Sequence, residues 1–326
     1  MNTAKILEIK AFRGIKNVGD WVRMPPKNGM AYLTEGVNID IDNDLMPHRR
    51  DGYGAKIYGG SRIHSFWSDG EKGLFVQDQD LRELTKYYTS LVLHEDVGDS
   101  RMNYTKIKKE IVYTNGSVIA YLDDEGFPQT FPTPTQTFKS AMKAGHLIEY
   151  FGGRLYVARG DQVWFSDPMA WRQTDERKNF KQFRGYVSLL RKVKDGLFIS
   201  DSEATYFMGG LNPQDSNLVK KANYPALLGT DAVIDGNFVG QGDTQGQMVI
   251  WLSKFGFCVG ADGGQFSNIS ADFYQARVAH PGAAIIRKNN GYFQYLVSQK
   301  TDPDIAVDFT LAPLTSTGSI PIFTIS

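Results

Sequence analysis

Six copies of one short pattern restrict the fold of this chain more than any other feature. In each copy a turn marked by glycine or charge leads into three or four apolar residues. In five copies a short polar gap then separates these from a second apolar run. The clearest copy is GRLYVARGDQVWF from Gly153. The others are GLFVQDQDLREL from Gly73, EIVYTNGSVIAYL from Glu110, GLFISDSEATYF from Gly196, MVIWLSKFGFCVG from Met248 and GYFQYLVS from Gly291. Two apolar runs joined by a compact polar connection are typical of a β-hairpin.

The spacing of the copies indicates how the hairpins are assembled. A lone hairpin is at best marginally stable in water, so each copy must belong to a larger sheet. The first apolar positions lie about 37 to 52 residues apart, close to the length of one four-stranded propeller blade. We predict an all-β chain, residues 1–326, folded as a single β-propeller domain of about six blades. The alternative is an irregular β-sandwich with evenly spaced hairpins, but six copies are too many for one ordinary sandwich.

Five further segments complete this prediction. Strands from the two ends of the chain are expected to close the propeller, and Lys5–Phe12 and Ile320–Ile325 are the candidates. Residues 13–36 are rich in proline and glycine, which predicts an extended arm or loop that protrudes from the domain. Helical patterns are scarce. Short helices are expected at Phe138–Ala144 and at Pro168–Asn179, the second after a Ser166/Asp167 cap.

Composition excludes several classes of function. The chain is 41% hydrophobic and 22% charged, with 36 Lys or Arg against 36 Asp or Glu, so no overall charge draws it to nucleic acid or an anionic membrane. Cys258 is the only cysteine, which rules out intrachain disulfides and cysteine-cluster metal sites. It is expected to be a small buried apolar residue in a protein made in a reducing cytoplasm. Neither a signal peptide nor a membrane span of roughly 20 apolar residues is found.

Two segments resemble ligand-binding loops without meeting their requirements. NIDIDND (Asn38–Asp44) resembles the start of a calcium loop, but Leu45 stands where glycine is needed and Asp51 where a bidentate glutamate is needed. A strand over Val37–Asp42 followed by a turn is expected instead. GQGDTQG (Gly240–Gly246) has neither the dinucleotide nor the P-loop spacing, and the strand MVIWLS follows it, which favours an ordinary loop.

No catalytic signature is present. The chain has no Gly-x-Ser-x-Gly elbow and no His-Glu-x-x-His motif, and no spacing puts two histidines on one helical face; the histidines are His48, His64, His94, His146 and His280. A glycosidase-type pair of carboxylates distant in sequence stays open. We therefore assign no catalytic, cofactor-binding or metal residues, expect no cofactor, and predict that the protein is not an enzyme.

Basic and aromatic residues leave alternatives open. Lys106, Lys108, Lys109 and the run His48–Arg50 are able to contact phosphate, although such groups more often form solvated faces. Trp171 is suited either to a sugar platform or to the core. In the clearest hairpin, turn and rim positions are predicted for Arg154, Arg159 and Asp161, and packing between blades for Trp164 and Phe165.

Seven phrases spread along the chain carry a resemblance to one family. They are FRGIKNV (Phe12–Val18), EGVNIDIDNDLMPHRRDGY (Glu35–Tyr53), RIHSFWSDG (Arg62–Gly70), EYFGGRLYVARGDQVWFSDP (Glu149–Pro168), DGLFISDSEATYFMGG (Asp195–Gly210), WLSKFGFCVGADGG (Trp251–Gly264) and ARVAHPGAAIIRKNNGYFQYLVS (Ala276–Ser298). With these the chain resembles the β-propeller tail-hub proteins of tailed bacteriophages, especially the nozzle or tail-stabilisation proteins of short-tailed phages. None of the phrases is a catalytic signature.

The resemblance implies a structural virion protein. Its copies would form an oligomeric ring, a homohexamer, around the genome-ejection channel of the tail. Its partners would be other copies, the phage adaptor or other tail proteins, and DNA in transient passage, with no membrane insertion. It would be made in the host bacterial cytoplasm and reside in the virion tail. A neutral balance suits a channel, because a strongly basic lumen would bind phosphate. The alternative is a carbohydrate-binding or glycan-cleaving β-propeller, since propellers often hold ligands at the mouth of the central channel.

Overall fold

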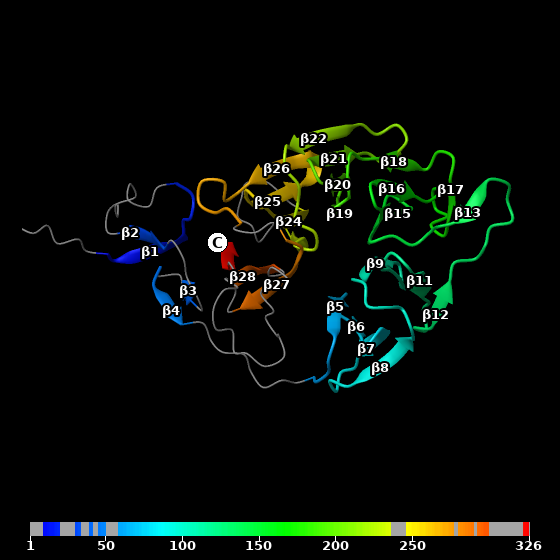
Figure 1. Ribbon diagram of the computed structural model, residues 1–326, viewed down its shortest axis with the longest axis horizontal. Coiled ribbons are helices and arrows are strands. Elements are labelled where there is room, and N and C mark those ends of the chain that lie inside the picture. The colour runs from blue at the N-terminus through cyan, green and yellow to red at the C-terminus, as the bar shows by residue number, and fades with distance from the viewer. Residues whose placement is uncertain are drawn as a thin grey trace, which may run out of the picture. The chain divides into compact units, whose positions relative to one another are not determined.

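The regular structure of the chain is almost entirely β-strand (Figure 1). The computed structural model describes residues 9–19, 30–33, 39–41, 45–49, 58–235, 246–276, 280–289, 292–299 and 322–325. Within these ranges one short 3-10 helix occurs, at Asp262–Gly264, and no helix has the length and apolar character needed to cross a membrane. The chain divides into two compact units, Gly54–Asn223 and a second made of Met1–Tyr53 and Tyr224–Ser326.

The unit Gly54–Asn223 contains four antiparallel four-stranded sheets that follow one another along the chain. Their strand orders are β5-β6-β7-β8, β12-β11-β10-β9, β14-β15-β16-β18 and β19-β20-β21-β22. The strands are β5 (Ile63–Ser68), β6 (Gly73–Gln77), β7 (Asp80–Leu84), β8 (Ser90–His94), β9 (Asn103–Ile107), β10 (Glu110–Thr114), β11 (Ile119–Leu122), β12 (Pro128–Thr130), β14 (Leu147–Phe151), β15 (Arg154–Arg159), β16 (Gln162–Phe165), β18 (Phe180–Gln182), β19 (Leu189–Val193), β20 (Gly196–Ser200), β21 (Thr205–Gly209) and β22 (Leu218–Ala222).

These sheets pack as propeller blades. The first strands β9, β14 and β19 of three consecutive sheets lie side by side. Successive side chains of a strand point to opposite faces, and in β10 they enter two different cores. Tyr113 packs with Leu74 of the preceding sheet, whereas Val112 packs with Val157 of the following sheet. Meandering four-stranded sheets stacked face to face in chain order are the organisation of a β-propeller. The predicted β-propeller fold is confirmed.

The second unit adds two more sheets of the blade type. One has the order β23-β24-β25-β26 and the other, three-stranded, the order β27-β28-β29. Tyr295 and Phe257 connect their cores in one apolar cluster. Six blade-type sheets therefore occur in the described residues, in line with about six blades. The strands are β23 (Ala232–Asp235), β24 (Gln247–Ser253), β25 (Gly256–Ala261), β26 (Gln265–Asn268), β27 (Gly282–Asn289), β28 (Tyr292–Gln299) and β29 (Ile322–Ile325).

The strands nearest the two chain ends belong to different sheets, and one pairs in parallel while the other pairs antiparallel. β29, inside the predicted Ile320–Ile325 segment, pairs antiparallel with β28 and completes the last sheet. β1 (Ala11–Ile15), which includes the last two residues of the predicted closing strand Lys5–Phe12, pairs in parallel with β2 (Met30–Leu33) and belongs to a different sheet from β29, so the described residues do not show the two terminal strands pairing; residues 5–8 lie outside them. Part of the segment 13–36, predicted as an arm, is thus a strand, because the run MAYL offers β1 an apolar partner nearby in sequence. Residues 20–29 and 34–36 of that segment lie outside the described residues.

The predicted hairpins are confirmed. In the first five copies the two apolar runs are the second and third strands of a sheet: β6–β7, β10–β11, β15–β16, β20–β21 and β24–β25. The sixth copy is β28, the middle strand of the last sheet. In the clearest copy Arg159 pairs with Gln162 across the turn at Gly160, whose φ is 63°. Glycine reaches this left-handed region without strain, so the turn chemistry sets the register.

Both predicted helices are wrong. Phe138–Ala144 contains strand β13 (Lys139–Ala141), and Pro168–Asn179 contains strand β17 (Gln173–Asp175). These two strands pair antiparallel, with Lys139 opposite Asp175. A helix of two or three turns is marginal in water, so pairing with a strand about thirty residues away outweighs a weak local preference.

Three smaller predictions concern single segments. β3 (Ile39–Ile41) pairs with β4 (Pro47–Arg49), which confirms a strand in Val37–Asp42; Asp42 and Asp44 lie outside the described residues. Of the loop Gly240–Gly246 only Gly246 is described, and the predicted strand follows it as β24. Cys258 is buried, as predicted, and burial raises the pKa of its thiol to about 11.

Candidate functional site

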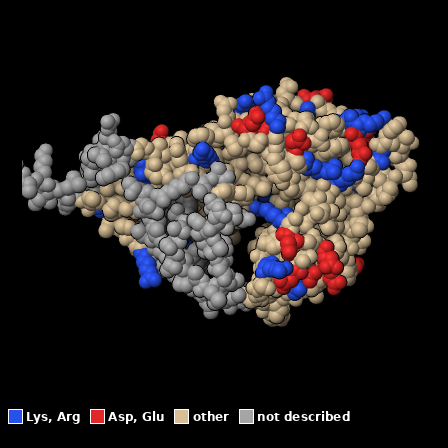
Figure 2. Space-filling model, viewed as in Figure 1, with Lys and Arg blue, Asp and Glu red and all other residues tan. Residues whose placement is uncertain are grey.

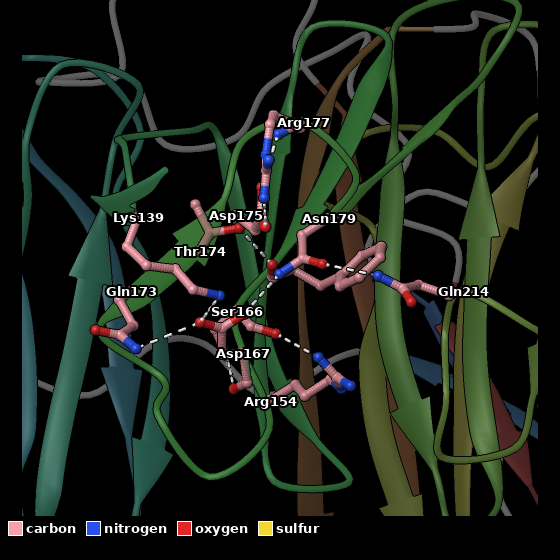
Figure 3. Close-up of polar contacts among 11 residues, drawn as sticks. Lys139, Arg154, Ser166, Asp167, Gln173, Thr174, Asp175, Arg177, Asn179 and Gln214 are labelled. Carbon is pink, nitrogen blue, oxygen red and sulfur yellow. Dashed lines mark hydrogen bonds and ion pairs between the residues drawn. The ribbon is translucent and has the colours of Figure 1, made fainter. Parts of the chain in front are cut away.

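A dense polar network surrounds Asp167, just after β16 (Figure 3). Asn179 donates its Nδ2 hydrogen to Asp167 Oδ1 at 2.9 Å, and Gln173 donates its Nε2 hydrogen to Oδ2 at 3.3 Å. The Lys139 ammonium lies 2.6 Å from the same Oδ2. Both carboxylate oxygens are therefore engaged by donors of the chain itself, which suits holding the 166–179 segment against β13 rather than binding a substrate.

The second acid of this network is Asp175 on β17. Arg177 donates to it twice, from Nη2 at 2.8 Å and from Nε at 2.9 Å, and this bidentate contact lowers the pKa of the Asp175 carboxyl. Next to it, Thr174 donates to the backbone oxygen of Phe165 and Arg154 donates to that of Ser166 at 2.7 Å. The Thr174 contact joins β17 to the end of β16, and the Arg154 contact holds the backbone at Ser166, directly after β16, against β15.

The network also reaches the next sheet. Gln214, in the β21–β22 connection, donates its Nε2 hydrogen to Asn179 Oδ1 at 3.0 Å, and Figure 3 shows both side chains pointing toward each other. Lys181 of β18 donates to the backbone oxygens of Gln214 and Ser216. The sheet β14–β18 and the sheet β19–β22 are thus joined at their outer parts by polar contacts as well as by apolar packing.

A second polar cluster lies on the first strands of three sheets. Glu149 of β14 is buried, and Thr105 of β9 donates to its Oε1 at 3.3 Å. From β19, the Lys192 ammonium lies 3.2 Å from Oε1 and Arg191 Nη1 lies 3.7 Å from Oε2. One carboxylate contacted by two cations connects three first strands of neighbouring blades, and loss of any one partner would leave an uncompensated charge there.

The described histidines are dispersed rather than gathered. His64, His94 and His146 are partly buried, and burial lowers the pKa of each. His94 Nδ1 lies 2.7 Å from the Tyr113 hydroxyl and His146 Nε2 lies 2.7 Å from the Val187 backbone oxygen. Among the described residues, no three His, Cys, Asp or Glu side chains come together in a way that could hold a metal ion.

Trp171 and Lys106 have contacts within the chain, whereas Lys108, Lys109, His48 and Arg49 are exposed, and Arg50 lies outside the described residues. The Trp171 ring is buried, packs edge-on against Tyr121 at 5.4 Å, and has the Arg172 guanidinium 4.0 Å above it. Of the two roles left open for Trp171, the structure shows the core one. Lys106 pairs with Asp69 at 2.5 Å, whereas Lys108 and Lys109 are exposed at a turn.

The structure shows where the residues with predicted roles in the clearest hairpin lie. Phe165 is buried, and Trp164 stacks on Phe180 with ring centroids 5.1 Å apart while packing against the core shared with the preceding sheet. This confirms packing between blades for Trp164, whereas the ring contact of Phe165 is with Tyr156 of its own sheet. Arg159 lies over the Trp164 ring at the end of β15, and Asp161 is exposed in the turn.

Charge is segregated over the unit Gly54–Asn223. Residues 58–100, which form the sheet β5–β8, contain eight Asp or Glu and four Lys or Arg. Residues 138–223, which form the sheets β14–β18 and β19–β22, contain nine Asp or Glu and 14 Lys or Arg. On the face shown in Figure 2, red atoms of Asp and Glu cluster near the sheet β5–β8 beside a few blue ones, whereas blue atoms of Lys and Arg are frequent over the sheets β14–β18 and β19–β22, where red ones also occur. Counting charge by blade would have revealed this from sequence, whereas the total of zero conceals it.

Comparison with known proteins shows only distant structural likeness. No family model matches the chain, and no curated protein matches its sequence. Among solved structures, the Pan2 WD40 domain of Neurospora crassa is 13% identical, with a TM-score of 0.44 over 72% of this chain and 71% of that one. The N-terminal domain of Nup159 is 10% identical, with a TM-score of 0.43 over 73% of each chain. A gluconolactonase of Xanthomonas campestris is 11% identical, with a TM-score of 0.42 over 70% of this chain and 79% of that one.

Proposed function

We propose that this chain is a structural virion protein of a tailed bacteriophage, a subunit of the tail hub or nozzle. Copies form a ring, a homohexamer, around the channel through which the genome leaves. The ring contacts the phage adaptor or other tail proteins, DNA passes through transiently, and no part inserts into a membrane. The protein is made in the host bacterial cytoplasm and resides in the virion tail.

The observation that carries this proposal is the segregation of charge within one compact unit. A surface rich in acids and a surface rich in bases on the same body favour head-to-tail association, in which each copy presents a different face to each neighbour. A contact of this kind closes into a ring when the rotation between neighbours divides a full turn. The sequence resemblance to phage tail-hub propellers supports the same assembly.

The polar clusters support a structural rather than a chemical role. The oxygens of Asp167 and Glu149 are engaged by donors from the chain itself. A general acid or a nucleophile needs an oxygen that faces a substrate. Both clusters instead join neighbouring blades, as a rigid wall subunit requires.

Size-exclusion chromatography with light scattering tests the ring directly. We expect a large species whose mass is a multiple of the 36.5 kDa chain, and negative-stain images of it should show rings. A monomer that persists at high concentration and retains oligosaccharide on a glycan array would contradict the ring and favour the carbohydrate-binding or glycan-cleaving alternative.

A further inference from the structure

The outer edge of the first sheet is unusually apolar for an exposed strand. β8 is the last strand in the order β5-β6-β7-β8, and its sequence SLVLH contains neither lysine nor proline. Leu91 is 57% exposed and Val92 38%, and the turn before them exposes Tyr87 by 74%. Natural proteins usually protect such edges with charge or proline, so an edge without this protection indicates a partner.

Acidic residues border this edge. Glu95 and Asp96 follow β8 directly and are both exposed. Gly98 donates its backbone hydrogen to the oxygen of Gln79, which places the segment after β8 beside the β6–β7 turn and its exposed Asp78. We name β8 with Tyr87, Glu95 and Asp96 the acidic edge.

The outer edge of the fourth sheet has the opposite charge. β22 ends the order β19-β20-β21-β22 and has the sequence LVKKA. Val219 is 49% exposed, and Lys220 beside it is also exposed. Lys221 lies over the Phe207 ring, 5.8 Å from its centroid, so its ammonium stays near the strand. We name β22 the basic edge. Both edges belong to the same compact unit, Gly54–Asn223.

We propose that the acidic edge of one copy docks on the basic edge of the next copy. This inference rests on the ring of the proposed function and assigns the surfaces that build it. Each edge strand is the last of its sheet and exposes apolar side chains, Leu91 and Val92 on β8 and Val219 on β22, and the charges at the two edges attract. Pairing of either edge with its own equivalent brings like charges together, which excludes a two-fold contact and leaves the head-to-tail one.

Charge reversal on each edge tests this assignment. The acidic-edge variant carries Glu95→Lys and Asp96→Lys, and the basic-edge variant carries Lys220→Glu and Lys221→Glu. Lys108→Glu with Lys109→Glu is the matched control, because it reverses an adjacent lysine pair in the same unit at the turn between β9 and β10. Circular dichroism and thermal melts check that every variant is folded.

The expected pattern is specific to a head-to-tail contact. Each edge variant should raise the dissociation constant of self-association at least about tenfold, while the control assembles as the unchanged protein does. An equimolar mixture of the two edge variants should assemble with the two variants alternating, since every contact between unlike variants joins one acidic edge to one basic edge, whereas each variant alone should not assemble. A chain carrying all four reversals should assemble again, because its edges are complementary with the signs exchanged.

The outcomes separate this inference from the proposed function. If the unchanged protein forms rings and both folded edge variants form them equally well, the ring stands and the assignment of its surfaces is overturned. A mixture of edge variants that stays monomeric also overturns the assignment. If the unchanged protein is monomeric at every concentration, both the proposed ring and the assignment of its surfaces are refuted.

Discussion

Replacing Asp167 by alanine should destabilise the unit Gly54–Asn223 substantially. The change removes the ion pair to Lys139 and two hydrogen bonds, from Asn179 and Gln173. The Asp167 side chain is 15% exposed and that of Lys139 is 22% exposed, so the stranded ammonium is only partly rehydrated. Removing one partner of a fully buried pair costs about 3–5 kcal/mol, and the residual exposure places this change near the lower limit, about 3 kcal/mol.

Companion variants separate the loss of the Asp167 charge from the loss of its hydrogen-bond acceptor and from the unpaired charge left on Lys139. Asp167→Asn keeps an acceptor for Asn179 but loses the charge, so it should cost about 1–2 kcal/mol. Adding Lys139→Met to Asp167→Ala removes the stranded charge and should recover about 1 kcal/mol. Asp124→Ala is the matched control, because that side chain is 58% exposed and its pair with Lys109 spans 3.5 Å. Such an exposed pair should contribute less than about 0.5 kcal/mol.

Urea unfolding followed by tryptophan fluorescence measures these differences, with the slope of the transition checked for each variant. The reasoning is refuted if Asp167→Ala lies within about 0.5 kcal/mol of the unchanged protein, because the network would then contribute no more than a surface pair. It is also refuted if Asp167→Asn and Asp167→Ala are equally damaging, since the retained acceptor would then have no effect.

Three further outcomes follow from local contacts. Gly145→Ala should lower the melting temperature, because the added Cβ would overlap the backbone oxygen of Ala158, and overpacking of this kind costs about 1–3 kcal/mol; an unchanged melt would contradict the contact. Burial raises the pKa of Asp69, but hydrogen bonds from Lys106 and from backbone N–H groups outweigh it and lower the pKa to about 2. A carboxyl whose pKa is depressed in the folded state contributes stability that is present above its unfolded pKa and lost as pH falls through the folded one. The stability gap between Asp69→Asn and the unchanged protein, measured by denaturation, should therefore shrink between about pH 4 and pH 2, and a constant gap would contradict this. Deleting the last seven residues should lower thermal stability markedly, since β29 within them completes the last sheet, and calorimetry would show an unchanged melt if that pairing were unimportant.

The sequence by itself determined the hairpins and the fold class. In the clearest copy, Val157 pairs with Trp164 and Arg159 with Gln162, so both strands and the glycine turn that registers them lie within about ten residues. Contacts this close in sequence depend on turn chemistry and on the alternation of apolar residues, both of which are visible in the sequence. Repetition of the hairpin at a blade-like interval then restricts the architecture to a propeller.

Only the tertiary structure decided the segments between the hairpins and the polar clusters. Lys139–Ala141 has no strong preference of its own and becomes a strand because Gln173–Asp175 lies beside it. Glu149 meets Thr105, 44 residues before it in the chain, and Lys192, 43 residues after it, because three blades bring their first strands together. The same stacking separates an acidic edge from a basic one in a chain of zero net charge. Local pattern encodes each blade, whereas contacts between blades arise only once the blades are stacked.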